Sequence, residues 1–97
     1  MPLVTVGGLF CVLILSGEEK IGPLIQEKFP NDFYTVAPGR WMISAPGMTT
    51  NGISDALGIT DGSRGTGIVF AFNSYFGRAN PQVWEWINAK QGVAKNG

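Results

Sequence analysis

The feature that most constrains the fold is an apolar run near the amino terminus, Leu3 to Leu15, which carries no charged residue. Successive side chains of an extended strand point to opposite faces of a sheet, and both faces of this run are apolar. One face carries Leu9, Cys11, Leu13 and Leu15, and the other carries Phe10, Val12 and Ile14. Such a run predicts a central strand with both faces covered, and Gly7 and Gly8 mark a bulge, a bend or the strand start.

The length and the flanks of this run argue against a membrane or targeting segment. It has thirteen residues, whereas a helix that crosses a bilayer needs roughly 20. It also lacks a charged leading segment and a cleavage pattern of small residues, so a secretory signal is the weaker alternative. The single cysteine, Cys11, cannot form an intrachain disulfide. We interpret it as a small apolar core residue of a protein in a reducing cytosol.

The clearest later strand is Thr66 to Asn73. Its alternation separates three bulky side chains from three smaller ones: Ile68, Phe70 and Phe72 against Val69, Ala71 and Asn73. A helix follows, because Asn80 can cap a helix end and Pro81 suits the first helical position. Trp84 and Trp86 fall on the two margins of the buried face of this helix. We expect them to anchor packing rather than to bind a ligand.

A first helix is expected between these two strands. Ser16 and Glu19 match a capping box, and the helix ends at the Lys28-Phe29 pair. Pro23 is tolerated only in a first helical turn, so the regular helix is expected to begin nearer Lys20.

A hairpin and a second helix are expected next. The β-prone runs DFYTV and WMISA are separated by Ala37-Pro38-Gly39-Arg40, a sequence suited to a type II turn. Thr49 or Thr50 can then cap a helix of two turns, which Gly58 ends.

The expected order is strand, helix, strand, strand, helix, strand, helix. This βαββαβ order with an additional C-terminal helix predicts the α+β class and a ferredoxin-like four-stranded antiparallel sheet. The 97 residues suffice for one domain, expected to span residues 1–91, with a flexible tail at 92–97.

The composition argues against several kinds of chemistry. Seven basic and seven acidic residues are spread along the chain, without the basic cluster on which nucleic-acid binding depends. The chain has no histidine, the commonest general base near neutral pH and the commonest metal ligand. We therefore expect no catalytic residue, no cofactor and no metal. The charge balance also argues against nucleic acid as a partner.

Four stretches follow one another in the last two thirds of the chain: GRWMISA, TTNGISDALGI, GTGIVFAFNSYFGRA and WEWINAK. They resemble small bacterial proteins of the SinR-like family, relatives of the CRISPR-associated ferredoxin-like nucleases. In that family a strand with a tryptophan, a short helix, a long apolar strand and a final tryptophan-containing helix come in this order. The resemblance implies the ferredoxin-like fold and the pairing of two subunits.

The same resemblance makes a metal-dependent nuclease or nucleic-acid-binding protein the alternative function. In the wider nuclease group an acidic residue closes the first strand and binds metal between two subunits. The matching place here is Leu15-Ser16-Gly17, and the nearest acids, Glu18 and Glu19, come later. The runner-up metal pair is Asp55 and Asp61. The simpler interpretation has Asp55 facing solvent and Asp61 bracing its own turn.

Two polar stretches are candidates for binding. The glycine-rich loop from Gly62 to Gly67 runs from a helix into a strand, opposite to a phosphate loop, and is expected to be a flexible connection. Ser74, Tyr75, Arg78 and Asn80 cluster at the corner between a strand and a helix. Polar groups at such a corner predict a small-ligand site, so a small-ligand sensor is the second alternative function.

The leading expectation comes from the two apolar faces of the first strand. The helices of a ferredoxin-like sheet cover one face, so either the last helix or another copy of the protein must cover the second. Further candidates for this surface, with their faces unassigned, are Tyr34, Trp41, Ile43 and Phe72. We therefore predict a non-enzymatic, homodimeric interaction module of the bacterial or phage cytosol, with another protein partner as a further option.

Overall fold

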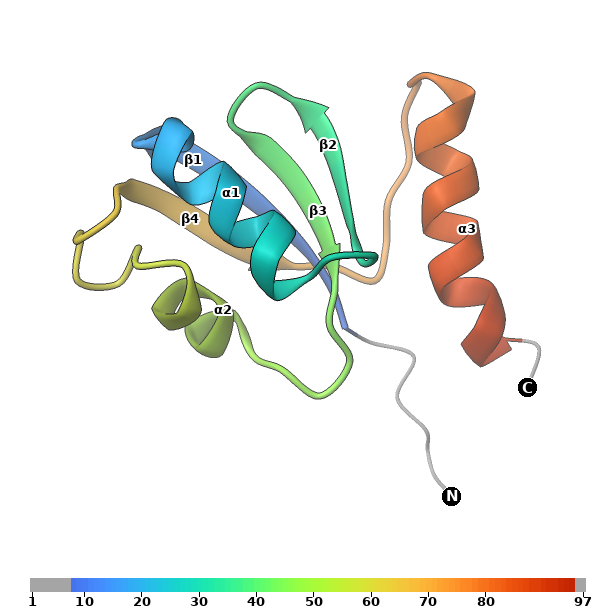
Figure 1. Ribbon diagram of the computed structural model, residues 1–97. Coiled ribbons are helices and arrows are strands. Elements are labelled where there is room, and N and C mark those ends of the chain that lie inside the picture. The colour runs from blue at the N-terminus through green and yellow to red at the C-terminus, as the bar shows by residue number, and fades with distance from the viewer. Residues whose placement is uncertain (1–7, 96–97) are drawn as a thin grey trace.

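The computed structural model describes residues 8–95 of the chain, and their side chains through residue 90. The described part contains seven elements (Figure 1): β1 (Leu9–Ser16), α1 (Glu18–Lys28), β2 (Phe33–Ala37), β3 (Arg40–Ser44), α2 (Thr50–Ala56), β4 (Thr66–Ala71) and α3 (Pro81–Lys95). Their order along the chain is the order that the sequence predicts.

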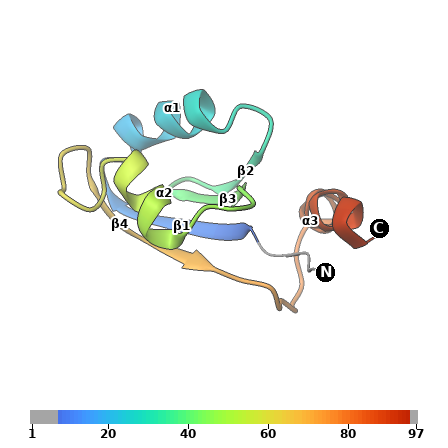
Figure 2. The same ribbon diagram turned by 90° about the horizontal axis from the view of Figure 1, so that it is seen from below.

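The four strands form one antiparallel sheet in the order β2-β3-β1-β4. β1 lies between β3 and β4, which confirms that the first apolar run contains a central strand. α1 and α2 lie on the same face of the sheet, whereas α3 stands apart from them, beyond β2 (Figure 1, Figure 2). Within residues 8–95 the protein is therefore an α+β fold with an open four-stranded antiparallel sheet and three helices.

The main core lies between the sheet and the pair α1 and α2. Phe10, Val12 and Ile14 of β1 are buried in it, as the alternation of the strand predicts. The other buried members are Ile21, Ile25, Phe29, Trp41, Ile43, Ala45, Ile53, Leu57 and Ile59. Because Ile25 of α1 and Ile53 of α2 are fully buried, apolar burial fixes both helices to this face.

The predicted local signals around α2 are confirmed. The side-chain oxygen of Thr49 accepts a hydrogen bond from the Gly52 amide at 2.9 Å and caps the helix. Gly58, with φ of 72°, ends it, and the amide of Ile59 donates to the carbonyl of Ser54 at 3.0 Å. The burial of Ile59 supplies the apolar contact that accompanies such an end.

The predicted start of α1 is wrong. Ser16 belongs to β1, where its hydroxyl is hydrogen-bonded to that of Thr66 at 2.8 Å, so it does not cap the helix. Gly17 precedes α1 instead, with a left-handed φ of 86° and no side-chain cap. The sharp turn from strand to helix requires this conformation, which glycine adopts without steric cost. α1 starts at Glu18, so Pro23 lies inside the helix rather than in its first turn.

Several element ends also differ from the predictions. β1 begins at Leu9 within the described residues, and the predicted strand segment 3–7 lies outside them. β4 ends at Ala71, two residues before the predicted end at Asn73, although the Phe72 amide still donates to the Leu9 carbonyl at 3.0 Å. α3 continues to Lys95, through the start of the predicted tail. Residues 72–80 form the linker between β4 and α3.

β4 is an edge strand of the sheet, and its sequence, TGIVFA, contains no charged residue and no proline. Charged residues and prolines are the usual means of keeping a sheet edge from pairing with another chain, and β4 has neither. Within residues 8–95, no helix combines the length and the apolar character that crossing a membrane requires.

Candidate functional site

The face of the sheet opposite α1 and α2, called the second face below, is the main candidate surface. Residues directly opposite one another in an antiparallel pair lie on the same face. Cys11 of β1 lies opposite Met42 of β3 and Phe70 of β4. Following this register in steps of two gives most apolar members of the second face: Leu9, Cys11, Leu13, Tyr34, Met42, Ile68 and Phe70. Val36 and Leu15 lie at shifts in the register, where this counting stops. Val36 belongs to the second face because it lines a groove together with Cys11, Met42 and Phe70, and Leu15 follows Leu13 near the end of β1.

α3 covers one end of the second face. Leu9, Met42 and Ile87 are buried together there. The partly buried side chains around them are Tyr34, Phe72, Val83, Trp84 and Trp86. The rings of Tyr34 and Trp86 lie 6.0 Å apart between centroids. Both tryptophans of α3 therefore pack against the sheet or its linker, as predicted.

Outside the cluster that α3 buries, Cys11 and Leu13 in the middle of the second face are half-buried, and the apolar side chains around them are exposed. Leu15 is 67% exposed, Ile68 and Phe70 are each 47% exposed, and Val36 is 45% exposed. These four residues, called the apolar patch below, come from β1, β4 and β2. Figure 2 shows α1 and α2 on the other side of the sheet and α3 beyond its end. The last helix thus covers only part of the surface that the sequence requires to be covered.

Two residues predicted for this surface lie elsewhere. Tyr34 and Phe72 do pack at the end that α3 covers. Trp41 and Ile43, however, are buried in the core beneath α1 and α2, so their assignment to this surface is wrong. In β3 the residues Trp41, Met42 and Ile43 are all apolar, so alternation alone gives no indication of which of them face the helices.

A groove lies between α3 and the second face. It has a volume of about 350 Å³, and its lining is almost wholly apolar. The residues that line it are Cys11, Val36, Met42, Phe70, Phe72, Ser74, Tyr75, Val83, Trp84 and Ile87. None of the residues with described side chains that line it is charged, so the groove suits an uncharged, apolar occupant.

Aromatic stacking holds the linker against α3 at one side of this groove. The Tyr75 ring lies at 90° to the Phe72 ring, with centroids 5.9 Å apart. The same ring stacks on Trp84 of α3 at 6.1 Å, with 18° between their planes. The linker therefore has a defined path along the helix.

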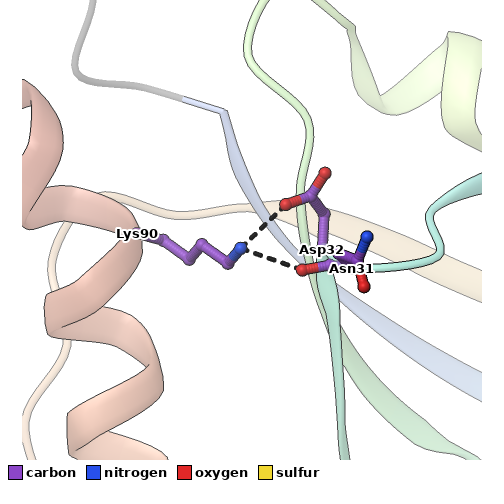
Figure 3. A network of polar contacts seen from close by, with 3 residues as sticks. All are labelled: Asn31, Asp32 and Lys90. Carbon is purple, nitrogen blue, oxygen red and sulfur yellow. Dashed lines mark hydrogen bonds and ion pairs between the residues drawn. The ribbon is translucent and has the colours of Figure 1, made fainter.

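A polar contact fixes the other end of α3. Lys90 donates hydrogen bonds to the carbonyl oxygen of Asn31 at 2.9 Å and to a carboxylate oxygen of Asp32 at 2.7 Å (Figure 3). The Lys90 ammonium also lies 5.9 Å from the centroid of the Trp86 ring. Over the part of α3 with described side chains, Trp84 near the start and Lys90 at the end both contact the rest of the fold.

The polar corner predicted as a ligand site is divided in the structure. Ser74 and Tyr75 line the groove, whereas Arg78 and Asn80 do not. Asn80 caps α3, because its side-chain oxygen accepts a hydrogen bond from the Gln82 amide at 3.0 Å. Arg78 is exposed and, among the described residues, forms no ion pair. The four residues therefore do not converge on one point.

Cys11 lies in the middle of the second face and lines the groove. It is a free thiol and is half-buried rather than fully buried. Burial raises the pKa of the Cys11 thiol above its ordinary value, because a thiolate loses solvation there. At neutral pH this thiol stays protonated and makes a poor nucleophile.

The two acids of the runner-up metal pair have separate surroundings. Asp55 is exposed on α2. Asp61 accepts a hydrogen bond from the Ser63 amide at 3.0 Å. This bond lowers the pKa of the Asp61 carboxyl, and a hydrogen bond from the Ser63 hydroxyl and the charge of Arg64 lower it further. Asp61 thus braces its own turn, as the simpler interpretation holds. Within residues 8–95, no three histidine, cysteine or acidic side chains are grouped so as to hold a metal ion.

The sequence indicates the second face but not the groove. The alternation of β1 predicts an apolar face that needs cover, and the structure places Cys11 and Leu13 on it. The groove depends on where α3 comes to rest, after a linker whose sequence carries no regular pattern. Comparison of the chain with protein-family models, with curated proteins and with solved structures found no match.

Proposed function

We propose that the protein is a non-enzymatic, homodimeric interaction module of the bacterial or phage cytosol, in which a second copy covers the apolar patch. The observation that carries this proposal is the exposure of Val36, Ile68 and Phe70 on the second face, together with that of Leu15 at the register shift that follows Leu13. A large apolar side chain that is half exposed presents on the order of 100 Å². Four such residues present about 400 Å², the size of the largest apolar patch on a typical monomer, and such patches are often functional.

The second face can meet a copy of itself. A twofold dimer needs one self-complementary patch, and an apolar sheet face packs on its copy as the two layers of a sandwich do. Arg40 lies opposite Leu13 in the sheet register and is exposed, so it provides a polar rim beside the patch. A stable interface buries about 800 Å² on each partner, so the patch would form its core and the rim would complete it.

The fold and family relationship belong to the same proposal. We infer that the sheet is of the ferredoxin-like type and that the chain is a distant relative of the SinR-like proteins. The support is the strand and helix order, the antiparallel order β2-β3-β1-β4 and the placement of α1 and α2 on one face. α3 is the additional helix of this arrangement.

The decisive experiment measures the mass of the protein in solution. Sedimentation equilibrium at protein concentrations from about 1 to 100 μM should give the mass of a dimer. Dissociation constants in the micromolar range are detected at these concentrations. Ile68→Glu places a charge in the patch and should shift the protein to the monomer. Met48→Glu is the matched control, because Met48 is also exposed but lies on the loop before α2, outside the second face.

Circular dichroism should show that both variants keep their fold. A wild-type monomer throughout this concentration range would refute the dimer. Equal effects of Ile68→Glu and Met48→Glu would mean that the pairing surface is not the patch.

A further inference from the structure

Phe76 is the most exposed large apolar side chain among the described residues. Its exposed fraction is 103%, so no described residue of its own subunit shields it. Its sequence neighbour Tyr75 is held by the rings of Phe72 and Trp84. The linker is therefore fixed on one side of Phe76, while the phenyl ring of Phe76 points into solvent.

The groove beside the linker is an unfilled apolar site. Its volume of about 350 Å³ exceeds the roughly 150 Å³ in which a cavity lined by apolar side chains binds benzene. A phenyl ring therefore fits with room for its Cβ. Cys11 and Phe70 of the sheet and Val83 and Trp84 of α3 all line the groove, so an inserted ring would contact apolar atoms of both elements.

We propose that Phe76 of each subunit inserts into the groove of the other subunit. This inference rests on the proposed homodimer and names its central contact. In a twofold dimer, a residue that touches a site on the partner is matched by the same contact in reverse. Each subunit carries one exposed ring and one apolar groove. In a twofold dimer, both rings can therefore bind in the two grooves, one from each side.

The occupant is the partner's ring rather than the subunit's own. Phe76 lines no part of the groove of its own subunit, whereas the residue before it does. The groove borders the apolar patch, since Val36 and Phe70 belong to both. A second copy seated on the patch thus brings its surface to the mouth of the groove. A central aromatic side chain that fills a pocket is the usual anchor of such an interface.

A photo-cross-link tests the contact directly. The full chain is prepared with p-azidophenylalanine at position 76, which keeps the phenyl ring, and isotopically heavy and light chains are mixed before irradiation. We expect cross-links to groove peptides that contain Met42, Val83 or Ile87, and we expect heavy and light chains joined in the same product. The same amino acid at position 48 is the control and should give no product with these peptides.

A second measurement uses Phe76→Ser, with Met48→Ser as the matched control. Phe76→Ser should raise the dissociation constant of the dimer by about 100-fold or more, because a symmetric dimer loses two central aromatic contacts. Met48→Ser should leave it within about threefold. Neither substitution touches the core, and the far-ultraviolet spectrum of each variant should match that of the wild type.

The outcomes separate this inference from the proposed function. A dimer that survives Phe76→Ser but is broken by Ile68→Glu overturns the insertion of Phe76 and keeps the homodimer. Cross-links only within one chain overturn it as well, because the ring then fills its own groove. An apolar small molecule that co-purifies in the groove of the dimer has the same consequence. A wild-type monomer overturns both proposals.

Discussion

The Lys90 ammonium lies 2.7 Å from a carboxylate oxygen of Asp32, so one side chain of α3 is paired with the turn that precedes β2. The Lys90 side chain is 24% exposed and that of Asp32 is 51% exposed, so water screens the pair in part. Of the residues with described side chains, these two form the ion pair that joins α3 to the body of the fold.

Lys90→Met should lower the free energy of unfolding by about 1 kcal/mol, because it removes the ion pair and the hydrogen bond to Asn31 but keeps the apolar stem. Asp32→Asn should cost less, since the bond from Lys90 to the Asn31 carbonyl remains. Urea titration at low and at high salt measures both, and salt should shrink the loss. Lys20→Met, on an exposed lysine of α1, is the control; a loss equal to that of Lys90→Met would contradict the prediction.

Gly17→Ala should be among the most damaging single changes in the chain. A Cβ on Gly17 would collide with the carbonyl oxygen of Arg64, so the backbone must move in addition to the strain of its φ of 86°. Gly62 has a comparable φ of 73° with open space around it, so Gly62→Ala measures the strain alone, about 1–2 kcal/mol. Thermal unfolding should show Gly17→Ala losing clearly more, and similar losses for the two variants would show that the close approach to Arg64 is unimportant.

Ile25→Ala should lower the free energy of unfolding by about 2–5 kcal/mol, because Ile25 is fully buried between α1 and the sheet and its truncation leaves a cavity. Met48→Ala removes a similar amount of side chain from an exposed position and should cost less than about 1 kcal/mol. Denaturant midpoints at one protein concentration give the comparison, since the stability of a dimer depends on concentration. A small loss for Ile25→Ala would mean that α1 is not fixed by this core.

The raised pKa of the Cys11 thiol predicts a dependence of stability on alkaline pH. The unfolded thiol ionises at its ordinary pKa and the folded thiol only at a higher pH, so the unfolded state loses its proton first. Stability is therefore unchanged below the ordinary thiol pKa and falls as pH rises through the interval up to the raised value. Cys11→Ala should lack this fall. Urea titrations of the two proteins at increasing pH measure it, and parallel curves would contradict the prediction.

Much of the fold could be predicted because its signals are local. The caps at Thr49 and Asn80 and the helix end at Gly58 each depend on a few neighbouring residues, and each occurs as predicted. The central position of β1 follows from its two apolar faces. The start of α1 was mispredicted because Ser16 is held in β1 by Thr66, fifty residues along the chain, and this contact has no local signature.

The candidate surface was predictable only in outline. The apolar residues from Leu9 to Leu15 of β1 indicate that both faces need cover, but the three consecutive apolar residues of β3 give no way to assign Trp41 and Ile43 to a face. The groove and the isolation of Phe76 depend on the path of the linker, which is set by contacts of Tyr75 with Phe72 and Trp84. Nothing in the sequence pattern of the linker or of α3 predicts that Tyr75 packs on Trp84.

The uncharged edge at β4 has a consequence for how the protein behaves at high concentration. Among the described residues no strand pairs with the outer side of β4, and β4 has no charged residue or proline that would hinder the addition of a strand from another chain. Ile68→Lys would provide one, but it would place an ammonium group in the middle of the apolar patch. At Ile68, resistance to aggregation requires a charged side chain and the proposed pairing requires an apolar one, so the two demands on this residue are opposed.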